Sequence, residues 1–140
     1  MNIRYDNKQK DLPSDQLQKL FVAVGWADRE SDDPGVLKYF SMPFVNSTLV
    51  VSAWDNARLI GAVRVLSDQM VRSAIYDLLV LPEYQNAGIG KELVKQCIAR
   101  YPDSEWLVCT ENHIAGYYEK LGFTRMNNSV FLHIPCKLFT

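Results

Sequence analysis

One stretch, Leu78 to Lys91, restricts the folds open to this chain more than any other segment. It begins with an apolar run that predicts a buried strand, and Pro82 interrupts that strand. Two glycines, Gly88 and Gly90, then lead into residues whose apolar positions recur at helical spacing. The stretch therefore predicts a strand, a glycine-containing loop and a helix in direct succession.

A loop of this kind suits an anionic ligand. The first turn of a helix leaves backbone N–H groups unpaired and carries the positive end of the helix dipole, so a pyrophosphate can bind there. Two other phosphate motifs do not fit. A Walker loop requires glycine at position 85 and serine or threonine at position 92, where this chain has Gln85 and Glu92. A dinucleotide fingerprint requires a third glycine at position 93, where this chain has Leu93. The glycines alone fit close helix–strand packing equally well.

The rest of the hydrophobic pattern predicts one α/β domain. Helices are expected over about 12–25, from Pro34, over 88–100 and over 113–121, and strands over 48–54, 59–66, 74–80, 105–110 and 129–134. The sequence shows no repeat, low-complexity tract or linker, so residues 1–140 are expected to form a single domain. The order of elements predicts a mixed central β-sheet flanked by helices.

Charge and cysteine content argue against several classes of function. The net charge is -1 and the pI is about 6.1, which gives no basic footprint for nucleic acid. Cys97, Cys109 and Cys136 are odd in number and widely spaced, which predicts neither a disulfide framework nor a zinc site. The lone histidines His113 and His133 give no metal site. With no signal peptide or membrane-spanning run visible, a reducing cytoplasm is the expected location.

At the strand and the loop, the chain resembles the GCN5-related N-acetyltransferase (GNAT) family. The family motif is Gln/Arg-x-x-Gly-x-Gly/Ala after a strand that ends Leu-x-Val-x-Pro. The matching residues, without a gap, are Leu78, Val80, Pro82, Gln85, Gly88 and Gly90. The segment Tyr118–Phe123 is similar to the family's Tyr-Glu-Lys-x-Gly-Phe, and the two motifs occur in family order. At Gly25-Trp26, 59–61 and 65–68, the chain more loosely resembles the subgroup that contains plant chloroplast serotonin-type acetyltransferases.

The resemblance implies acetyl-CoA as cosubstrate, with no metal. In the family, the loop backbone holds the CoA pyrophosphate and the preceding strand hydrogen-bonds the pantetheine arm. These roles fall on Leu78, Leu79 and Val80 in the strand and on Gln85, Asn86, Ala87, Gly88, Ile89, Gly90 and Lys91 in the loop. The family often places an asparagine seven residues before its tyrosine, where this chain has Glu111. We assign that pantetheine contact to Asn112, one position later, whose simplest alternative role is to cap the helix at His113.

The resemblance also implies two catalytic residues. Tyr118 corresponds to the family tyrosine that protonates the leaving thiolate; the alternative is an aromatic residue packed at a helix edge beside Tyr117. Asp77 is the candidate base, because a charge in an otherwise apolar strand is costly unless it is paired or used. The alternative role for Asp77 is structural, as a buried carboxylate hydrogen-bonded to a loop. In that case Glu111 or ordered water would act as the base. Glu111 itself is more simply a solvated carboxylate before a helix.

The expected reaction is transfer of an acetyl group from acetyl-CoA to a primary amine of a small molecule or a protein. Two alternatives stay open: a longer acyl donor on the same scaffold, and a non-catalytic acyl-CoA-binding or sensor module. The loops and first helices that select an acceptor vary within this fold, so the sequence does not name the amine. Family habit favours a homodimer, and neither nucleic acid nor membrane is expected as a partner.

Overall fold

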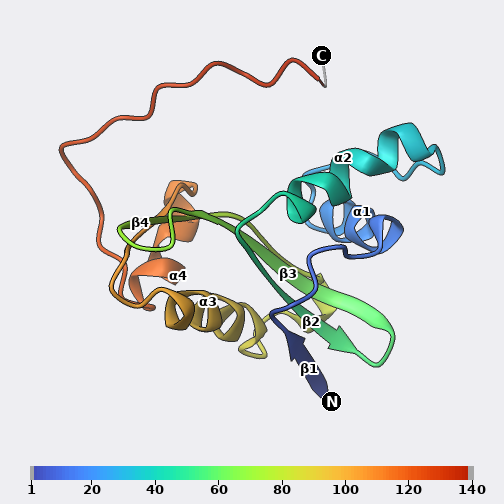
Figure 1. Cartoon of the computed structure of the whole chain (residues 1–140), viewed down its shortest axis with the longest axis horizontal. Coiled ribbons are helices and arrows are strands. Elements are labelled where there is room, and N and C mark those ends of the chain that lie inside the picture. Colours follow the sequence, from blue (N-terminus) through green and yellow to red (C-terminus); the bar gives the residue numbers. More distant parts are fainter. Residues whose placement is uncertain (1, 139–140) are drawn as a thin grey trace. The chain divides into compact units, whose positions relative to one another are not determined.

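A mixed sheet of five strands, in the order β1-β2-β3-β4-β5, organises the first part of the chain (Figure 1). The computed structural model describes residues 2–138, which divide after Cys109 into two units. The strands are β1 (Ile3–Asp6), β2 (Leu49–Asp55), β3 (Arg58–Ser67), β4 (Arg72–Val80) and β5 (Glu105–Val108). Neighbours from β1 to β4 are antiparallel, and β5 pairs with β4 in parallel.

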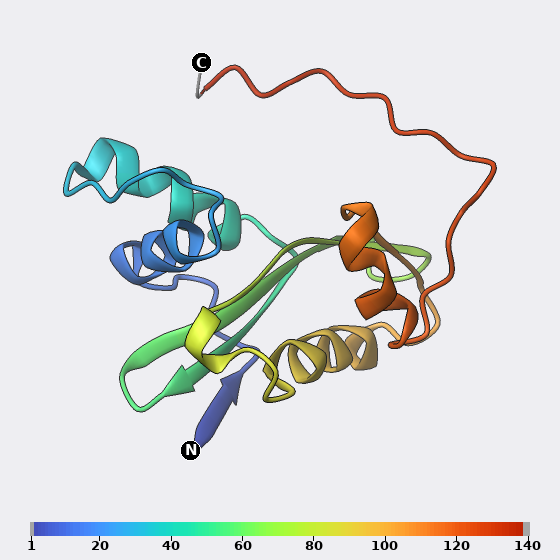
Figure 2. The same ribbon diagram turned by 180° about the vertical axis from the view of Figure 1, so that it is seen from behind.

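Helices cover both faces of this sheet. Figures 1 and 2 show α1 (Ser14–Ala23) and α2 (Pro34–Val45) on one face and α3 (Ile89–Arg100) on the other. The α3 helix approaches closely at Gly61 of β3, where an added Cβ would lie 3.3 Å from Leu93 Cδ1. Because both faces are covered, β2 and most of β3 are buried over nearly their whole length, as continuous apolar strands require.

One irregularity in the sheet matters for the site. Arg64 of β3 lies opposite Asp77 of β4, but the next residue, Val65, lies opposite Ile75. Tyr76 is therefore an extra residue in β4, which makes a β-bulge. Bulges bend a strand and often re-aim side chains beside functional sites.

The second unit, residues 110–138, contains the short 3-10 turn η2 (Asn112–Ile114) and the helix α4 (Ala115–Glu119). The helix expected over 113–121 is thus shorter and begins with a 3-10 turn; Gly122 follows it at φ +103°. No helix among the described residues combines the length and apolarity that a membrane crossing requires.

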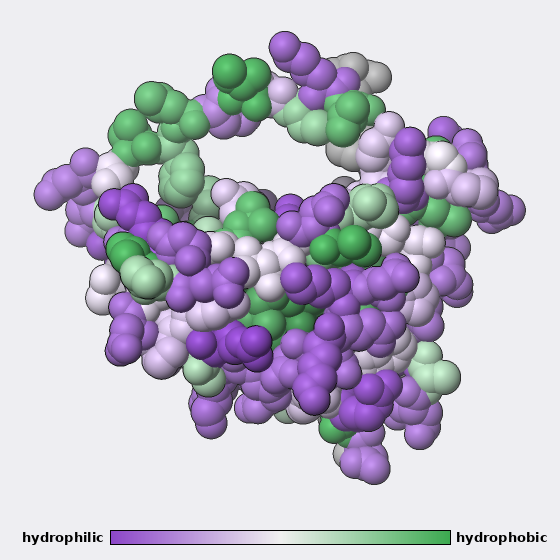
Figure 3. All heavy atoms as spheres, in the orientation of Figure 1, coloured by the Kyte–Doolittle hydropathy of each residue, from purple (hydrophilic) through white to green (hydrophobic). Residues whose placement is uncertain are grey.

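The strand expected over 129–134 is wrong, because these residues form neither helix nor strand. Strand propensity expresses a fit to a pleated, half-buried surface and needs a pairing partner. All strand pairing among the described residues involves β1 to β5. The segment's apolar side chains stay exposed, including Val130, Phe131 and Leu132 at 80% or more, and Figure 3 shows hydrophobic atoms along it.

Candidate functional site

The loop between β4 and α3 has the backbone conformation that its glycine predicts. After β4 the chain makes the 3-10 turn η1 (Pro82–Tyr84) and then passes through Asn86 at φ +65° and Gly88 at φ +81°. Gly88 is the N-cap of α3, and an added Cβ there would meet no atom within 4 Å. Close helix–strand packing is therefore the wrong explanation for Gly88, which is needed for its left-handed backbone.

The start of α3 leaves backbone N–H donors without an intrahelical partner. The first hydrogen bond into the helix runs from Glu92 N to Gly88 O at 3.0 Å, so the N–H groups of Ile89, Gly90 and Lys91 precede it. No side chain caps this end of α3 within residues 2–138. The loop residues 85–88 are exposed. Unpaired N–H groups at the positive end of a helix dipole are suited to bind a phosphate or pyrophosphate.

The second half of β4 has an open edge toward this loop. β5 pairs with β4 only over Arg72–Ile75, so within the first unit residues 76–80 have a strand neighbour on the β3 side alone. The Gln85 side chain returns to the end of β4, where its Nε2 donates to Val80 O at 3.0 Å. An extended ligand that carries amide groups can pair with the remaining edge of Leu78 and Leu79 as an added strand would.

Asp77 is partnered by a residue that the sequence analysis did not identify. Arg64 Nε donates to Asp77 Oδ2 at 2.6 Å, and Arg64 Nη1 donates to Ser47 Oγ at 3.4 Å. The side chains of Arg64 and Asp77 are 18% and 22% exposed. Partial burial explains the pairing, because a carboxylate removed from water needs a compensating charge. The alternative given for Asp77, a hydrogen bond to a loop, therefore names the wrong partner, because Arg64 belongs to the neighbouring strand β3.

The Arg64–Asp77 pair faces the side of the sheet that α1 and α2 cover, since Ser47 follows α2 directly. The ring of Tyr76, the bulged residue, is 58% exposed and lies beneath the Arg64 guanidinium at 5.4 Å. The sequence did carry a signal for this pair, because each of two adjacent apolar strands contains one charged residue. Matching Arg64 to Asp77 also requires the register of β3 against β4, which the local pattern does not give.

Tyr118 lies in the second unit, on α4, and is 8% exposed. Its ring makes edge-to-face contacts with Tyr117 and Phe123, at centroid distances of 5.3 and 5.6 Å. Burial, and to a smaller extent Tyr117, raises the pKa of Tyr118 to about 12. The hydroxyl is therefore protonated throughout the neutral and mildly alkaline range.

The other two residues singled out in this unit are exposed. Glu111 is the N-cap of η2, and its Oε2 lies 3.3 Å from His113 Nδ1, with both side chains more than 70% exposed. This is the environment expected of a solvated carboxylate. Asn112 is the first residue of η2 rather than a cap, and Glu111 makes no capping hydrogen bond. The helix-capping role expected for Asn112 is therefore wrong, because the turn begins one residue earlier than predicted.

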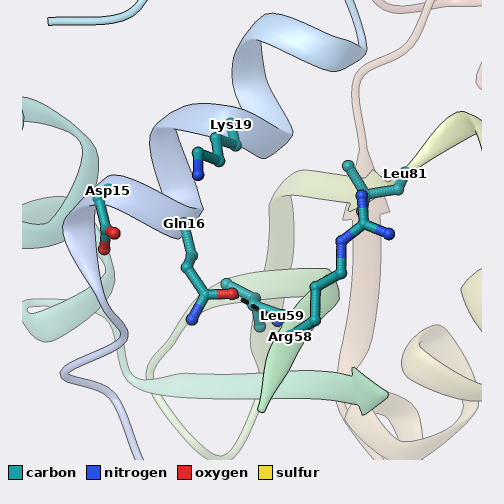
Figure 4. A pocket seen from close by; sticks show the side chains of 6 residues that line it. All are labelled: Asp15, Gln16, Lys19, Arg58, Leu59 and Leu81. Atoms are coloured by element: carbon teal, nitrogen blue, oxygen red, sulfur yellow. Dashed lines mark hydrogen bonds between the residues drawn. The ribbon is translucent and has the colours of Figure 1, made fainter. Parts of the chain in front are cut away.

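A pocket of about 300 Å³ lies on the α1 side of the first unit (Figure 4). Its lining residues are Asp15, Gln16, Lys19, Arg58, Leu59 and Leu81. None of them is among the residues expected to bind cofactor or to catalyse. The pocket borders the end of β4 at Leu81 and the turn between β2 and β3 at Arg58. Among residues 2–138, no cluster of three metal-ligating side chains is present.

The three free cysteines should differ sharply in reactivity. Cys97 is buried on α3, where burial raises the pKa of its thiol to about 12, whereas Cys109 and Cys136 are exposed. Because the thiolate is the reactive form, we expect two thiols to react quickly with a disulfide reagent and the third only on unfolding. Absorbance titration of native and denatured protein measures both counts, with Cys97→Ala as the matched control. Three fast thiols in the native protein would contradict the burial of Cys97.

Comparison with known proteins places the chain beside acetyltransferases. The family model described as "Acetyltransferase (GNAT) domain" matches residues 38–133. The chain is 28% identical to the uncharacterized N-acetyltransferase ycf52 of Pyropia yezoensis, over 86% of this chain and 70% of that protein. It is 26% identical to the chloroplastic GCN5-related N-acetyltransferase 1 of Arabidopsis thaliana, over 80% of this chain and 56% of that protein.

A solved structure also shares the fold. A GNAT-family acetyltransferase from Streptococcus pneumoniae TIGR4 superposes with a TM-score of 0.76 at 24% identity, covering 96% of this chain and 98% of that one. Similarity at this identity concerns the fold. The mixed sheet with helices on its faces, expected from the sequence, is thereby confirmed. The similarity to chloroplast proteins agrees with the subgroup indicated by the sequence.

Proposed function

Because the chain belongs to the GNAT acetyltransferase family, we propose that it transfers the acetyl group of acetyl-CoA to a primary amine. Its relatives are named N-acetyltransferases, which supports an enzyme rather than a sensor module. The acceptor is proposed as a small-molecule amine or the amine of a peptide. For location we retain the reducing cytoplasm, which the cysteine pattern favours, and a homodimer stays a prediction.

The loop at the start of α3 carries this proposal. Its unpaired N–H groups at Ile89, Gly90 and Lys91, together with the left-handed backbone at Gly88, support binding of the CoA pyrophosphate. The adjacent residues Gln85, Asn86 and Ala87 are proposed to complete that binding loop. The open edge of β4 at Leu78, Leu79 and Val80 supports pairing with the pantetheine amides, with Asn112 as a further proposed contact.

The proposed reaction needs three events at the thioester. The lone pair of the neutral amine forms a bond to the acetyl carbon, and the carbon–sulfur bond breaks. The nitrogen loses one proton to a base, and the departing CoA thiolate gains one proton from an acid, so the products are the N-acetyl amine and CoA. A base matters because an alkyl amine is mostly protonated at neutral pH. Detection of an N-acetylated product from a panel of amines tests the proposal.

Tyr118 is proposed as the acid. A hydroxyl with a pKa of about 12 keeps its proton at neutral pH. An ordinary thiol has a pKa of roughly 8.5, so full proton transfer from Tyr118 to a free CoA thiolate runs uphill. The hydroxyl therefore acts first as a hydrogen-bond donor that stabilises the negative charge developing on sulfur as the carbon–sulfur bond breaks, and the tyrosinate left by proton transfer regains its proton from water. The edge-to-face contacts of Tyr118 with Tyr117 and Phe123 hold its ring in one orientation.

Asp77 is proposed as the base, with Glu111 or ordered water as the alternatives. Arg64 occupies Asp77 Oδ2, so Asp77 would accept a proton through its other oxygen or through water. Asp77→Asn should lower turnover by about a hundredfold at neutral pH, the lower end of the usual range for acid–base catalysis. The loss should shrink at high pH, where free amine is abundant. Steady-state rates across the pH range measure it.

Arg64→Gln is the matched control, because it breaks the same ion pair and keeps the Asp77 carboxylate. If Asp77 is the base, only Asp77→Asn shows a loss that depends on pH. If the pair is purely structural, both variants lose activity and melting temperature in parallel at every pH. That second outcome would remove Asp77 from the mechanism and leave Glu111 or water as the base.

A further inference from the structure

The turn between β2 and β3 is tied to the segment that leads into the proposed pyrophosphate loop. Tyr84, the last residue of η1, donates from its hydroxyl to Asp55 Oδ2 at 2.5 Å. Arg58 Nη2 donates to Glu83 Oε1 at 2.8 Å, and the Arg58 guanidinium lies 5.8 Å from the centre of the Tyr84 ring. Two residues of η1 are thus joined to the two ends of one tight turn.

These contacts differ in expected strength. Arg58 and Glu83 are 55% and 54% exposed, and an ion pair at such exposure contributes little and is screened by salt. The Tyr84–Asp55 hydrogen bond is partly buried and has a carboxylate as acceptor, which makes it the stronger contact. That hydrogen bond is also the main cause of the raised pKa of Tyr84. The Tyr84–Asp55 bond is therefore the contact to test.

The turn is itself held in place from the opposite side. Gln16 of α1 accepts from Leu59 N at 2.7 Å and donates to Ala57 O at 3.2 Å, and Figure 4 shows the first of these bonds. Helix α1 thus fixes the β2–β3 turn, and Asp55 at the start of that turn holds Tyr84. A fixed anchor matters because the loop beyond it, residues 85–88, is exposed and contains two left-handed residues, Asn86 and Gly88.

We propose that Tyr84 and Asp55 are positioning residues that preorganise the pyrophosphate loop through their hydrogen bond. Without it, η1 can move away from the turn, and the N–H donors of Ile89, Gly90 and Lys91 must be ordered when the ligand binds. Ordering a loop on binding costs affinity, whereas a preorganised loop does not bear that cost. This inference rests on the proposed function, since it assumes that acetyl-CoA binds at this loop.

Tyr84→Phe keeps the ring and deletes the donor. We expect the dissociation constant for acetyl-CoA, measured by calorimetry, to rise about three- to tenfold. The KM for acetyl-CoA should rise with it, while kcat changes little because the reacting atoms are untouched. Tyr101→Phe is the matched control: Tyr101 stacks on Trp106, and within residues 2–138 its hydroxyl makes no hydrogen bond. That variant should bind acetyl-CoA as the wild type does.

A double-mutant cycle shows whether Tyr84 and Asp55 act through each other. Asp55→Ala should match Tyr84→Phe, the double variant should lose no more than either, and Asp55→Asn should partly rescue binding because it keeps an acceptor oxygen. Additive losses, or a lower melting temperature with unchanged acetyl-CoA affinity, would overturn the proposal.

Hydrogen exchange separates this proposal from the proposed function. In the free protein, amides 85–88 should exchange faster in Tyr84→Phe than in the wild type or Tyr101→Phe. Wild-type protein that does not bind acetyl-CoA would contradict the proposed function, while the exchange rates still decide whether the hydrogen bond orders the loop. Unchanged exchange in Tyr84→Phe would overturn the positioning role.

Discussion

Gly88→Glu should weaken acetyl-CoA binding by at least about a hundredfold, which corresponds to roughly 2.7 kcal/mol. Gly88 adopts φ +81° at the N-cap of α3, a conformation that costs other residues roughly 1–2 kcal/mol. The added side chain would also occupy the space in front of the N–H donors of Ile89, Gly90 and Lys91. Its carboxylate would repel the pyrophosphate. Calorimetry on the folded variant measures the loss.

Gly25→Glu is the matched control for this substitution. Gly25 follows α1 at φ +85°, and an added Cβ there would also meet no atom within 4 Å. Both variants therefore carry the same backbone strain, the same open surroundings and the same added charge. Only Gly88→Glu should lose acetyl-CoA binding. Equal affinities in the two variants would show that the pyrophosphate does not bind at this loop.

Tyr118→Phe should lower turnover by ~10²-fold or more when chemistry limits the rate, the scale of a lost general acid. The substitution keeps the ring and its contacts with Tyr117 and Phe123, so acetyl-CoA affinity and melting temperature should change little. The raised pKa, about 12, adds a second expectation. The wild-type rate should climb with pH as the amine loses its proton, without a decline from Tyr118 below about pH 11.

Tyr117→Phe is the internal control, because Tyr117 sits beside Tyr118 and is more exposed, at 39%. It should have a mild effect on turnover. A wild-type rate in Tyr118→Phe under chemistry-limited conditions would show that Tyr118 is not the acid. An unfolded Tyr118→Phe would show instead that the residue serves packing, the alternative that its aromatic neighbours support.

The elements that local pattern predicted well are those whose sequence signals agree with one another. The hairpin of β2 and β3 was expected because two apolar runs flank the polar turn at Asp55–Arg58, and the register confirms it. The α3 helix was expected from its apolar stripe, and Ile89, Leu93 and Cys97 are buried as predicted. Gly88 alone predicts three features of this region: the loop, the start of α3 and the left-handed backbone conformation.

The elements that were missed or misplaced depend on distant partners. β1, Ile3–Asp6, is short and half polar, so nothing local marks it as a strand; its pairing with the far end of β2 makes it one. Residues 129–134 show the reverse case. Their apolar composition predicts a strand, but none of the paired strands among the described residues supplies a partner.

The same limit applies to the site. The loop could be predicted because its residues are contiguous, from Gln85 to Lys91. The contacts of Asp77 with Arg64 and of Tyr84 with Asp55 cross between strands and turns, and each depends on a register that local pattern does not determine. The bulge at Tyr76 has the same origin, since an extra residue is visible only when two strands are aligned.

The most direct test of the acetyltransferase assignment is product analysis. The wild-type protein would be incubated with acetyl-CoA and a panel of small amines, polyamines, aminoglycosides and peptides, and each reaction would be followed by mass spectrometry and by release of CoA. Thiol detection of CoA requires subtraction of the exposed Cys109 and Cys136. We predict that one class of amine gains a single acetyl group on nitrogen in an amount equal to the CoA released. Release of CoA by hydrolysis alone, or acetyl-CoA binding without transfer to any amine, would contradict the account.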